Sequence, residues 1–464
     1  MLSCVRSCYR SINVKSCLLI YLIVSWPLIT CAKSETLSQA LGNAYLLNAE
    51  LAAQRADTRA VDESLPGALA DYRPSVSGNA DAGLLKERYI FPGSPNLDRT
   101  SRPAGASVQV SVNLFNGFQT SNKVSQAMAQ IMYSREYLRY TELSVLANGV
   151  QSYMHVLRDS AVVTLREDNL KLLKRQVVDT QDRVRLGEVT ETDLAQTSAA
   201  LAQAKIELVN SLSNLAASKE SYKQVIGVVP ASLSPAKPLV KLLPQTLQEA
   251  RMIANADHPL ITAASHNVET AKYAVKIAAG ELLPSVSLTG TLGRRNDYAG
   301  VQKQRYNEGL VVGQLSVPIY DGGATYSRVR GVKEKETQAQ AQLDQQRAQV
   351  LAQVGASWAA WQNSHLAIAA SLDQVTYAEA ALAGVREEAR LGQRTTLDIL
   401  NAQQLLVNAR ITLINTQHDQ VISSYSLLAS MGHLSAETLS LSVLRYSAQQ
   451  HLDKVQNKWF GLTP

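Results

Sequence analysis

RLGEVTETDL occupies residues 185–194, and the closely similar RLGQRTTLDI occupies residues 390–399. Their glycines are 205 positions apart, because 392 − 187 = 205. Leu-Gly is typical of a helix end, where glycine adopts the left-handed conformation. Thr-x-x-Asp is typical of a capping box, which satisfies free backbone groups at the start of a helix. The two stretches therefore predict the same helix–turn–helix tip twice in one chain.

The duplication extends far beyond the two tips. RPSVS at residues 73–77 returns as LPSVS at 283–287, and VNLFNG at 112–117 returns as VPIYDG at 317–322. Self-similarity at a fixed offset is the mark of a repeated structural unit. The chain is therefore predicted to contain an internal two-fold repeat.

The repeat predicts how the chain is organised. Residues 33–230 and 246–435 are interpreted as two structural repeats, each with a helix, two strands, a very long helix, a hairpin turn and a returning helix. A proline-rich connection at 231–245, expected at the equator of the molecule, joins them. Residues 436–464 lie outside the repeat and are expected to be equatorial or disordered.

The helices are predicted from proline spacing and heptads. No proline occurs between Pro103 and Pro230 or after Pro318 until Pro464. Residues 118–186 can therefore run as one helix of roughly 100 Å, at about 1.5 Å per residue. Apolar residues then recur every seven positions in each returning helix, which predicts a coiled-coil seam. These residues are Leu194, Leu201, Leu208, Leu215 and Tyr222 in the first repeat, and Leu400, Val407, Ile414, Val421 and Leu428 in the second.

Four strands are predicted from strict alternation of small apolar and polar residues, at residues 75–84, 107–114, 286–292 and 313–319. This pattern fits strands between lipid and a wet lumen, and it also fits a soluble sheet with one solvated face. Aromatic residues near the strand ends favour the membrane. Four strands cannot close a barrel, and an open edge in lipid is costly. Several chains would therefore have to share one barrel.

The N-terminus favours export. Basic residues precede a short apolar run at residues 17–29, and small residues follow it, which is typical of a cleaved signal peptide over residues 1–32. A membrane anchor is the alternative. All four cysteines lie in this leader, so the mature chain would have no disulfide and no cysteine-bound metal. Cys31 could instead accept a lipid, although Thr30 before it departs from the lipoprotein pattern.

The remaining composition excludes several function classes. The chain carries 45 basic and 39 acidic residues, interspersed along its length, which gives little support to nucleic-acid binding. Its seven histidines are scattered, and the His-Glu-x-x-His, Gly-x-Ser-x-Gly and phosphate-loop motifs are absent from the sequence. We therefore expect no enzyme, no cofactor and no metal centre. A periplasmic coiled-coil adaptor is a further alternative, although adaptors carry one hairpin rather than two.

The tips offer the best candidate site. Asp193 and Asp398 are expected to cap helices, and rings of such carboxylates at a narrow mouth would also attract cations. Arg394 stands where the first repeat has Val189, because 394 − 205 = 189. This arginine could pair with Asp193 of a neighbouring hairpin or remain a solvated surface residue.

The order and duplication of these motifs over residues 36–435 resemble the TolC family of outer-membrane channel-tunnel proteins. The resemblance implies a homotrimer, in which three chains form a twelve-stranded barrel in outer-membrane lipid and a twelve-helix tunnel in the periplasm. It also implies docking on a periplasmic adaptor and an inner-membrane pump of the RND, ABC or MFS type. Such a duct exports drugs, ions or proteins passively and is gated at its helix tips.

The same resemblance implies roles for residues at the tips. A gate is expected from Arg394 together with Thr192 and Asp193 of the adjacent protomer. Asp398 is expected in a cation-attracting entrance ring, where Asn401 replaces a second aspartate and so weakens the site. Ala389 replaces a constricting tyrosine, which implies fewer interactions that keep the entrance closed. The tips expected to contact the adaptor are Leu186, Gly187, Leu391 and Gly392.

Overall fold

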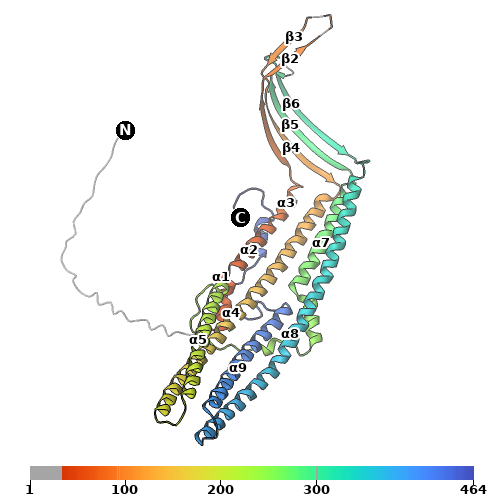
Figure 1. Cartoon of the computed structure of the whole chain (residues 1–464). Coiled ribbons are helices and arrows are strands. Elements are labelled where there is room, and N and C mark those ends of the chain that lie inside the picture. Colours follow the sequence, from red (N-terminus) through yellow and green to blue (C-terminus); the bar gives the residue numbers. More distant parts are fainter. Residues whose placement is uncertain (1–33, 91, 94, 299–300, 464) are drawn as a thin grey trace, which may run out of the picture.

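The computed structural model describes residues 34–90, 92–93, 95–298 and 301–463. The molecule is elongated, with two long helical hairpins at one end and a tall curved sheet at the other (Figure 1). Expectations for the leader, its cysteines and its cleavage site concern residues outside these ranges.

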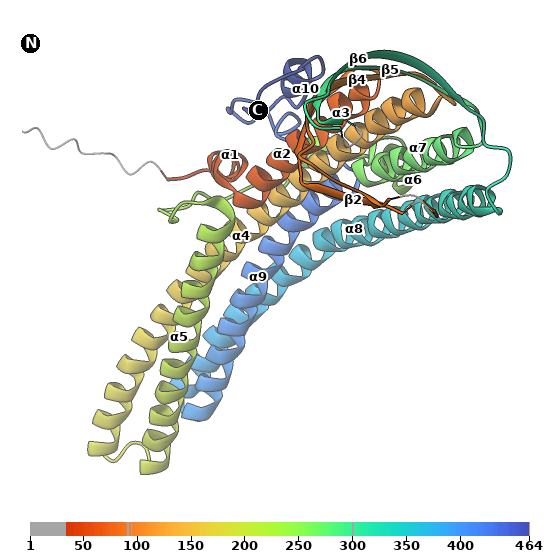
Figure 2. The same cartoon turned by 90° about the horizontal axis from the view of Figure 1, so that it is seen from above.

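The two hairpins are near copies. Helix α4 (Gln119–Arg185) turns into α5 (Glu191–Ile226), and α8 (Ala324–Arg390) turns into α9 (Thr396–Ser430). Both long helices have 67 residues and begin 205 positions apart, because 324 − 119 = 205. The prediction of one unbroken helix over residues 118–186 is confirmed. Figure 2 shows the two hairpins side by side, with α4 beside α9.

The seam of the first hairpin differs from the predicted one. The leucine heptad of α5 is only half-buried, and only its last member, Tyr222, is fully buried. The small residues three positions after each leucine are the ones packed deeply against α4: Thr197, Ala204, Ser211 and Ser218. Small side chains bring the two backbones close together, so the seam depends on close approach more than on leucine packing. In the second hairpin the predicted Leu400, Val407, Val421 and Leu428 are buried.

The four predicted strands form one antiparallel sheet in the order β1 (Ser75–Ala82), β4 (Ala104–Asn116), β5 (Ser285–Asn296) and β6 (Arg305–Ser316). Corresponding positions lie side by side across it, with Val110 opposite both Val76 and Gly290. Val76, Val110, Gly290 and Val311 therefore share one face, whereas Leu310 and Val312 of β6 pair with threonines on the opposite face. The predicted positions Val317 and Ile319 lie beyond the end of β6. The sheet stands beyond the helices, and no described helix covers either face (Figure 1).

Two strands were not predicted. Strands β2 (Leu85–Tyr89) and β3 (Leu97–Ser101) form a separate two-stranded hairpin at the far end of the sheet (Figure 1). Arg88 and Asp98 face each other across it, with Nε 3.3 Å from the carboxylate oxygen. The hairpin lies in the loop that makes the first repeat longer than the second.

The main core lies at the equator, halfway along the helices. It combines α1 and the middle of α4 with the ends of α5 and α9 and with the connecting and C-terminal segments. The Tyr153 hydroxyl of α4 donates to the backbone oxygens of Glu35 and Ser234, at 2.9 and 2.6 Å. No helix of the described residues is long and apolar enough to span a bilayer. The shorter helices are α1 (Leu37–Leu47), α2 (Ala49–Asp62), α3 (Ser64–Ala70), the 3-10 turn η1 (Val240–Leu242), α6 (Leu247–Asp257), α7 (Pro259–Gly280) and α10 (Gln449–Val455).

Two glycines join the sheet to the helices. Gly117 lies between β4 and α4 with a φ of +66°, and Gly280 ends α7 beside it. A Cβ on either residue would collide with the carbonyl oxygen of the other. Only glycine fits both positions, because the backbones touch and the φ of Gly117 is left-handed.

Candidate functional site at the hairpin tips

Each hairpin reverses direction over a five-residue turn whose second residue is glycine. Gly187 and Gly392 have φ values of +72° and +80°, as the Leu-Gly pattern predicts. The next amide, of Glu188 or Gln393, donates to the backbone oxygen five residues earlier, at 2.9 Å in both tips. This is the Schellman arrangement that satisfies the last carbonyl groups of a helix. The leucines before the glycines, Leu186 and Leu391, are 74% and 68% exposed, so each tip ends in an apolar side chain.

Both returning helices begin with the predicted capping boxes. The hydroxyls of Thr190 and Thr395 accept from the backbone N–H groups of Asp193 and Asp398. The carboxylates accept in return from the threonine N–H groups, at 3.0 Å in both tips. Hydrogen bonds from Thr190 hold the pKa of Asp193 below its usual range, and those from Thr395 do the same for Asp398. Both tips therefore carry a fixed negative charge at neutral pH.

The arginines of the tips form an ion pair in each turn, which the sequence analysis missed. In the first tip Arg183 donates to Glu188, with Nε 3.2 Å from Oε2. In the second tip Arg394 donates to Glu388, with the same atoms 2.7 Å apart. Glu388 occupies the position of Arg183, because 388 − 205 = 183. The charges are therefore reversed: the cation precedes the turn in one tip and follows it in the other.

Only some of the predicted gate residues approach one another within one chain. Arg394 is bound to Glu388, and the charge of Asp398 acts on it as well. Asp193 lies close to the other hairpin, since the Thr396 hydroxyl contributes to lowering its pKa. Thr192 is exposed. Arg394 is therefore not joined to Asp193 of its own chain.

The interface between the hairpins contains a buried polar contact just behind the tips. The Gln403 amide of α9 donates to the Asn169 amide oxygen of α4 at 2.9 Å, and both side chains are buried. A recess of about 450 Å³ lies beside them, bordered by Asn401, Leu173 and Leu400. Leu173 and Leu400 also pack with Ala204 of α5 at the same level. The two hairpins are therefore joined by a small apolar cluster and a buried amide pair, in which loss of one amide would leave the other unsatisfied.

A second polar contact joins the same helices nearer the equator. His155 of α4 stacks on His418 of α9, with ring centroids 5.2 Å apart. The Nδ1 atom of His418 lies 2.8 Å from the Asp419 carboxylate. Burial, followed by the positive charge of Arg158, lowers the pKa of His155. His155 is therefore uncharged at neutral pH.

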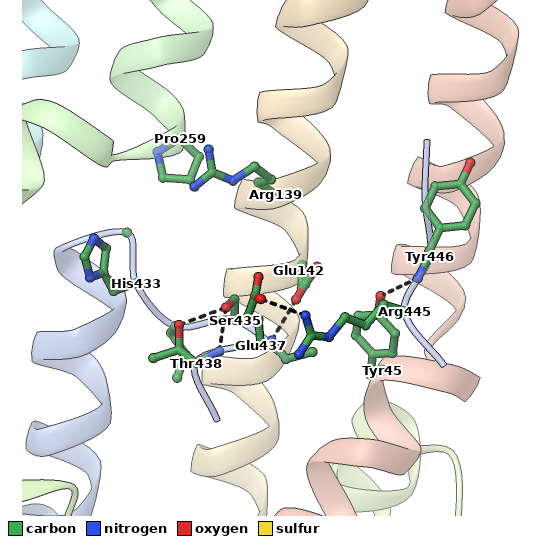
Figure 3. A pocket seen from close by; sticks show the side chains of 13 residues that line it. Tyr45, Arg139, Glu142, Pro259, His433, Ser435, Glu437, Thr438, Arg445 and Tyr446 are labelled. Carbon is green, nitrogen blue, oxygen red and sulfur yellow. Dashed lines mark hydrogen bonds and ion pairs between the residues drawn. The ribbon is translucent and has the colours of Figure 1, made fainter. Parts of the chain in front are cut away.

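The equator has its own polar cavity of about 440 Å³, between α4 and the segment after α9 (Figure 3). Glu142 of α4 accepts from the backbone N–H of Ala436 at 2.9 Å, and burial raises its pKa. Arg445 donates to Glu437 at 2.7 Å within the C-terminal segment. The Glu142 bond attaches the C-terminal segment to α4 at the equator, and the Arg445 bond holds the segment together. Among the described residues, no cluster of three histidine, cysteine or acidic side chains could hold a metal ion.

The arrangement of two hairpins, one open sheet and an equatorial core matches known proteins. The family model described as "Outer membrane efflux protein" matches residues 37–228 and 252–433. The chain belongs to the outer membrane efflux protein family. The predicted membership of the TolC family is confirmed, and the protein is one of the outer-membrane channel-tunnels rather than an enzyme.

Individual relatives agree with the family assignment. "Outer membrane efflux protein BepC" of Brucella suis biovar 1 (strain 1330) is 37% identical over 432 residues, which are 93% of this chain and 92% of that protein. "Outer membrane protein TolC" of Escherichia coli (strain K12) is 24% identical and covers 88% of this chain and 84% of its own. The Campylobacter jejuni CmeC outer membrane channel has the same fold, with a TM-score of 0.77 at 16% identity over 91% of this chain and 89% of that channel.

Proposed function

We propose that three copies of this efflux protein form one continuous duct, through which solutes pass from a periplasmic adaptor and inner-membrane pump to the outside. The observation that carries the proposal is the open sheet. Within the described ranges of the chain, the edge strands β1 and β6 have no strand paired on their outer sides, and they run in opposite directions. The β6 edge of one chain can therefore pair with the β1 edge of the next, and three sheets of four strands close a ring.

The helices support the same assembly. Contacts order the four long helices as α5, α4, α9 and α8, so α5 and α8 form the two edges of the layer. Both edge helices carry exposed apolar side chains: Ile206, Val209 and Leu212 on α5, and Leu366, Leu372 and Tyr377 on α8. Apolar surface of this extent is typical of a protein interface. A neighbouring protomer would cover it.

The names of the relatives indicate two classes of transport, efflux and protein secretion. BepC is named as an efflux protein, and we propose the same for this chain, as the exit duct of an efflux system. Other relatives are named as secretion proteins, such as "Alkaline protease secretion protein AprF" of Pseudomonas aeruginosa, so type I secretion is an equal candidate, and the pump that docks at the tips would decide between them. Acylation of Cys31 would add a lipid anchor to the same duct.

The proposal is tested by extracting the full-length protein from outer membranes and measuring its mass and its conductance in planar bilayers. We expect a detergent-solubilised trimer that conducts ions. A soluble monomer without channel activity would contradict the proposal.

The entrance ring gives a further prediction. Asp398→Asn removes the charge and keeps an oxygen for the helix cap, so block by hexaamminecobalt(III) from the periplasmic side should weaken on the order of tenfold. Asn401→Asp adds a second carboxylate one turn along the helix and should strengthen the block. The control is Asp182→Asn, which removes an exposed charge before the first tip. Equal block in all variants would place the cation site elsewhere.

A further inference from the structure

Three tyrosines of α4 form a stacked ladder above the equator. The rings of Tyr133 and Tyr137 are nearly parallel, at 13°, with centroids 6.2 Å apart. Tyr140 continues the row, 6.1 Å from Tyr137. Tyr133 and Tyr137 remain 37% and 38% exposed. None of the three hydroxyls is hydrogen-bonded to another described residue, so the ladder presents exposed ring surface and free hydroxyl groups.

The ladder faces away from α10. Arg135 lies two residues from both Tyr133 and Tyr137, and it donates to Gln449 of α10 at 2.8 Å. Two residues correspond to about 200° of helical rotation, so the tyrosines lie on the opposite side of α4 from α10. If α10 lay inside the duct, three copies of it would form an extra layer that narrows the lumen. In the proposed duct α10 therefore lies outside, and the tyrosines face the lumen.

The ladder has neighbours within the protomer. Ser134, one residue along from Tyr133, bonds Thr58 of α2, at 3.3 Å between the hydroxyls. Gln126 lies two turns before Tyr133 on the same side of α4, and it donates to the Thr270 backbone oxygen of α7 at 3.3 Å, so α7 packs close beside the ladder. Tyr133 and Tyr137 nevertheless stay exposed within the protomer.

Tyr140 also borders a recess of about 340 Å³ between α4, α7, α8 and α9. Its floor includes Leu143 and Val350, and its rim includes Gln346 and Gln349. The only titratable groups among its lining residues are Tyr140 and His258, and burial lowers the pKa of His258 to about 4. The recess is therefore uncharged at neutral pH, with amides available for hydrogen bonds.

We propose that the tyrosine ladder and this recess form a transit site for uncharged aromatic solutes on the lumen wall. Offset stacking on tyrosine favours aromatic rings, and the glutamine amides can bind polar substituents. A charged solute would lose hydration in the recess, whose lining side chains carry no charge at neutral pH. The site rests on the proposed duct, because it faces a lumen only in the assembled tube.

The test uses full-length protein in planar bilayers and measures current block by 4-methylumbelliferyl β-D-glucoside, which is aromatic and uncharged. The phosphate ester of the same ring is the charged comparison. We expect the glucoside to block at lower concentration than the phosphate. Tyr137→Ala should weaken glucoside block about threefold to tenfold, and Tyr137→Phe should retain most of it, because the ring supplies the stacking.

Two further variants make the outcome decisive. Tyr326→Ala removes a 52% exposed tyrosine of α8 outside the ladder and should leave the block unchanged. Gln349→Lys should strengthen block by the phosphate, because it places a cation at the rim of the recess. Equal block by glucoside and phosphate, or unchanged block in Tyr137→Ala channels of normal conductance, would overturn the transit site. Absence of any conductance would instead contradict the proposed duct.

Discussion

Replacing Arg394 by serine is expected to raise the resting conductance of the channel on the order of threefold to tenfold. The guanidinium has five donors, and within the described part of the chain only its Nε is hydrogen-bonded, to Glu388. In the proposed trimer we expect the remaining donors to bind Asp193 of the next protomer, whose lowered pKa keeps it charged. Exposed ion pairs are individually weak, but three of them around a closed ring act together.

Single-channel recording in planar bilayers distinguishes this gate from a local effect. Asp193→Asn keeps the helix cap and removes the charge, so it should leak as Arg394→Ser does. Glu388→Gln should leak less than Arg394→Ser does, because it weakens the ion pair that positions Arg394 and keeps the arginine itself. The control is Arg390→Ser, which removes a neighbouring exposed arginine paired with Glu387. If Arg394→Ser and Asp193→Asn channels both show the resting conductance of the parent channel, these residues do not form the gate.

Acidification is expected to destabilise the equator through His258. This residue begins α7, and its Nδ1 accepts from the Leu260 backbone N–H at 3.2 Å. Burial, with a smaller effect of Arg139, lowers its pKa from 6.5 to about 4. The unfolded chain therefore takes up a proton at a higher pH than the folded chain does. Stability is complete above pH 6.5 and falls as pH drops towards 4, by about 2–3 kcal/mol per protomer.

The first repeat supplies the matched variant. Asn48 begins α2 in the same way, and its side-chain oxygen accepts from the backbone N–H groups of Glu50 and Leu51. His258→Asn should keep the cap at pH 7.5 and reduce the loss of unfolding free energy between pH 6.5 and 4. Urea titrations in detergent at several pH values measure the difference. His266→Asn, at a more exposed histidine of the same helix, should follow the parent, and a parallel loss in His258→Asn would refute the assignment.

The large elements could be predicted because their signals are local. Absence of proline over residues 104–229 and regular heptads are properties of one helix, and alternation is a property of one strand. Strands β2 and β3 escaped prediction because their sequences, LKERY and LDRTS, are charged and have no apolar face. Their pairing depends on cross-strand contacts such as Arg88 with Asp98, which a single strand does not reveal.

The site was predicted less completely than the fold. Alignment of the two tips places Arg394 against Val189, and it also places Arg183 against Glu388. That difference is the sequence signal for the reversed ion pairs. The contact between Asn169 and Gln403 joins residues 234 positions apart. Nothing in the local sequence relates them, because the contact arises only when one hairpin lies against the other.

The glycines at the sheet–helix junction have a consequence for how the two halves can diverge. Gly117 is fixed twice, by its left-handed φ and by the Gly280 backbone against it. Its duplicate Gly322 has a φ of +72° and open space around a Cβ within one protomer. Asparagine tolerates that conformation, so the second copy can drift during evolution where the first cannot. Ancestral duplication placed a glycine at both positions. Gly117 is retained for its backbone contact and its φ, whereas Gly322 is retained for its φ alone.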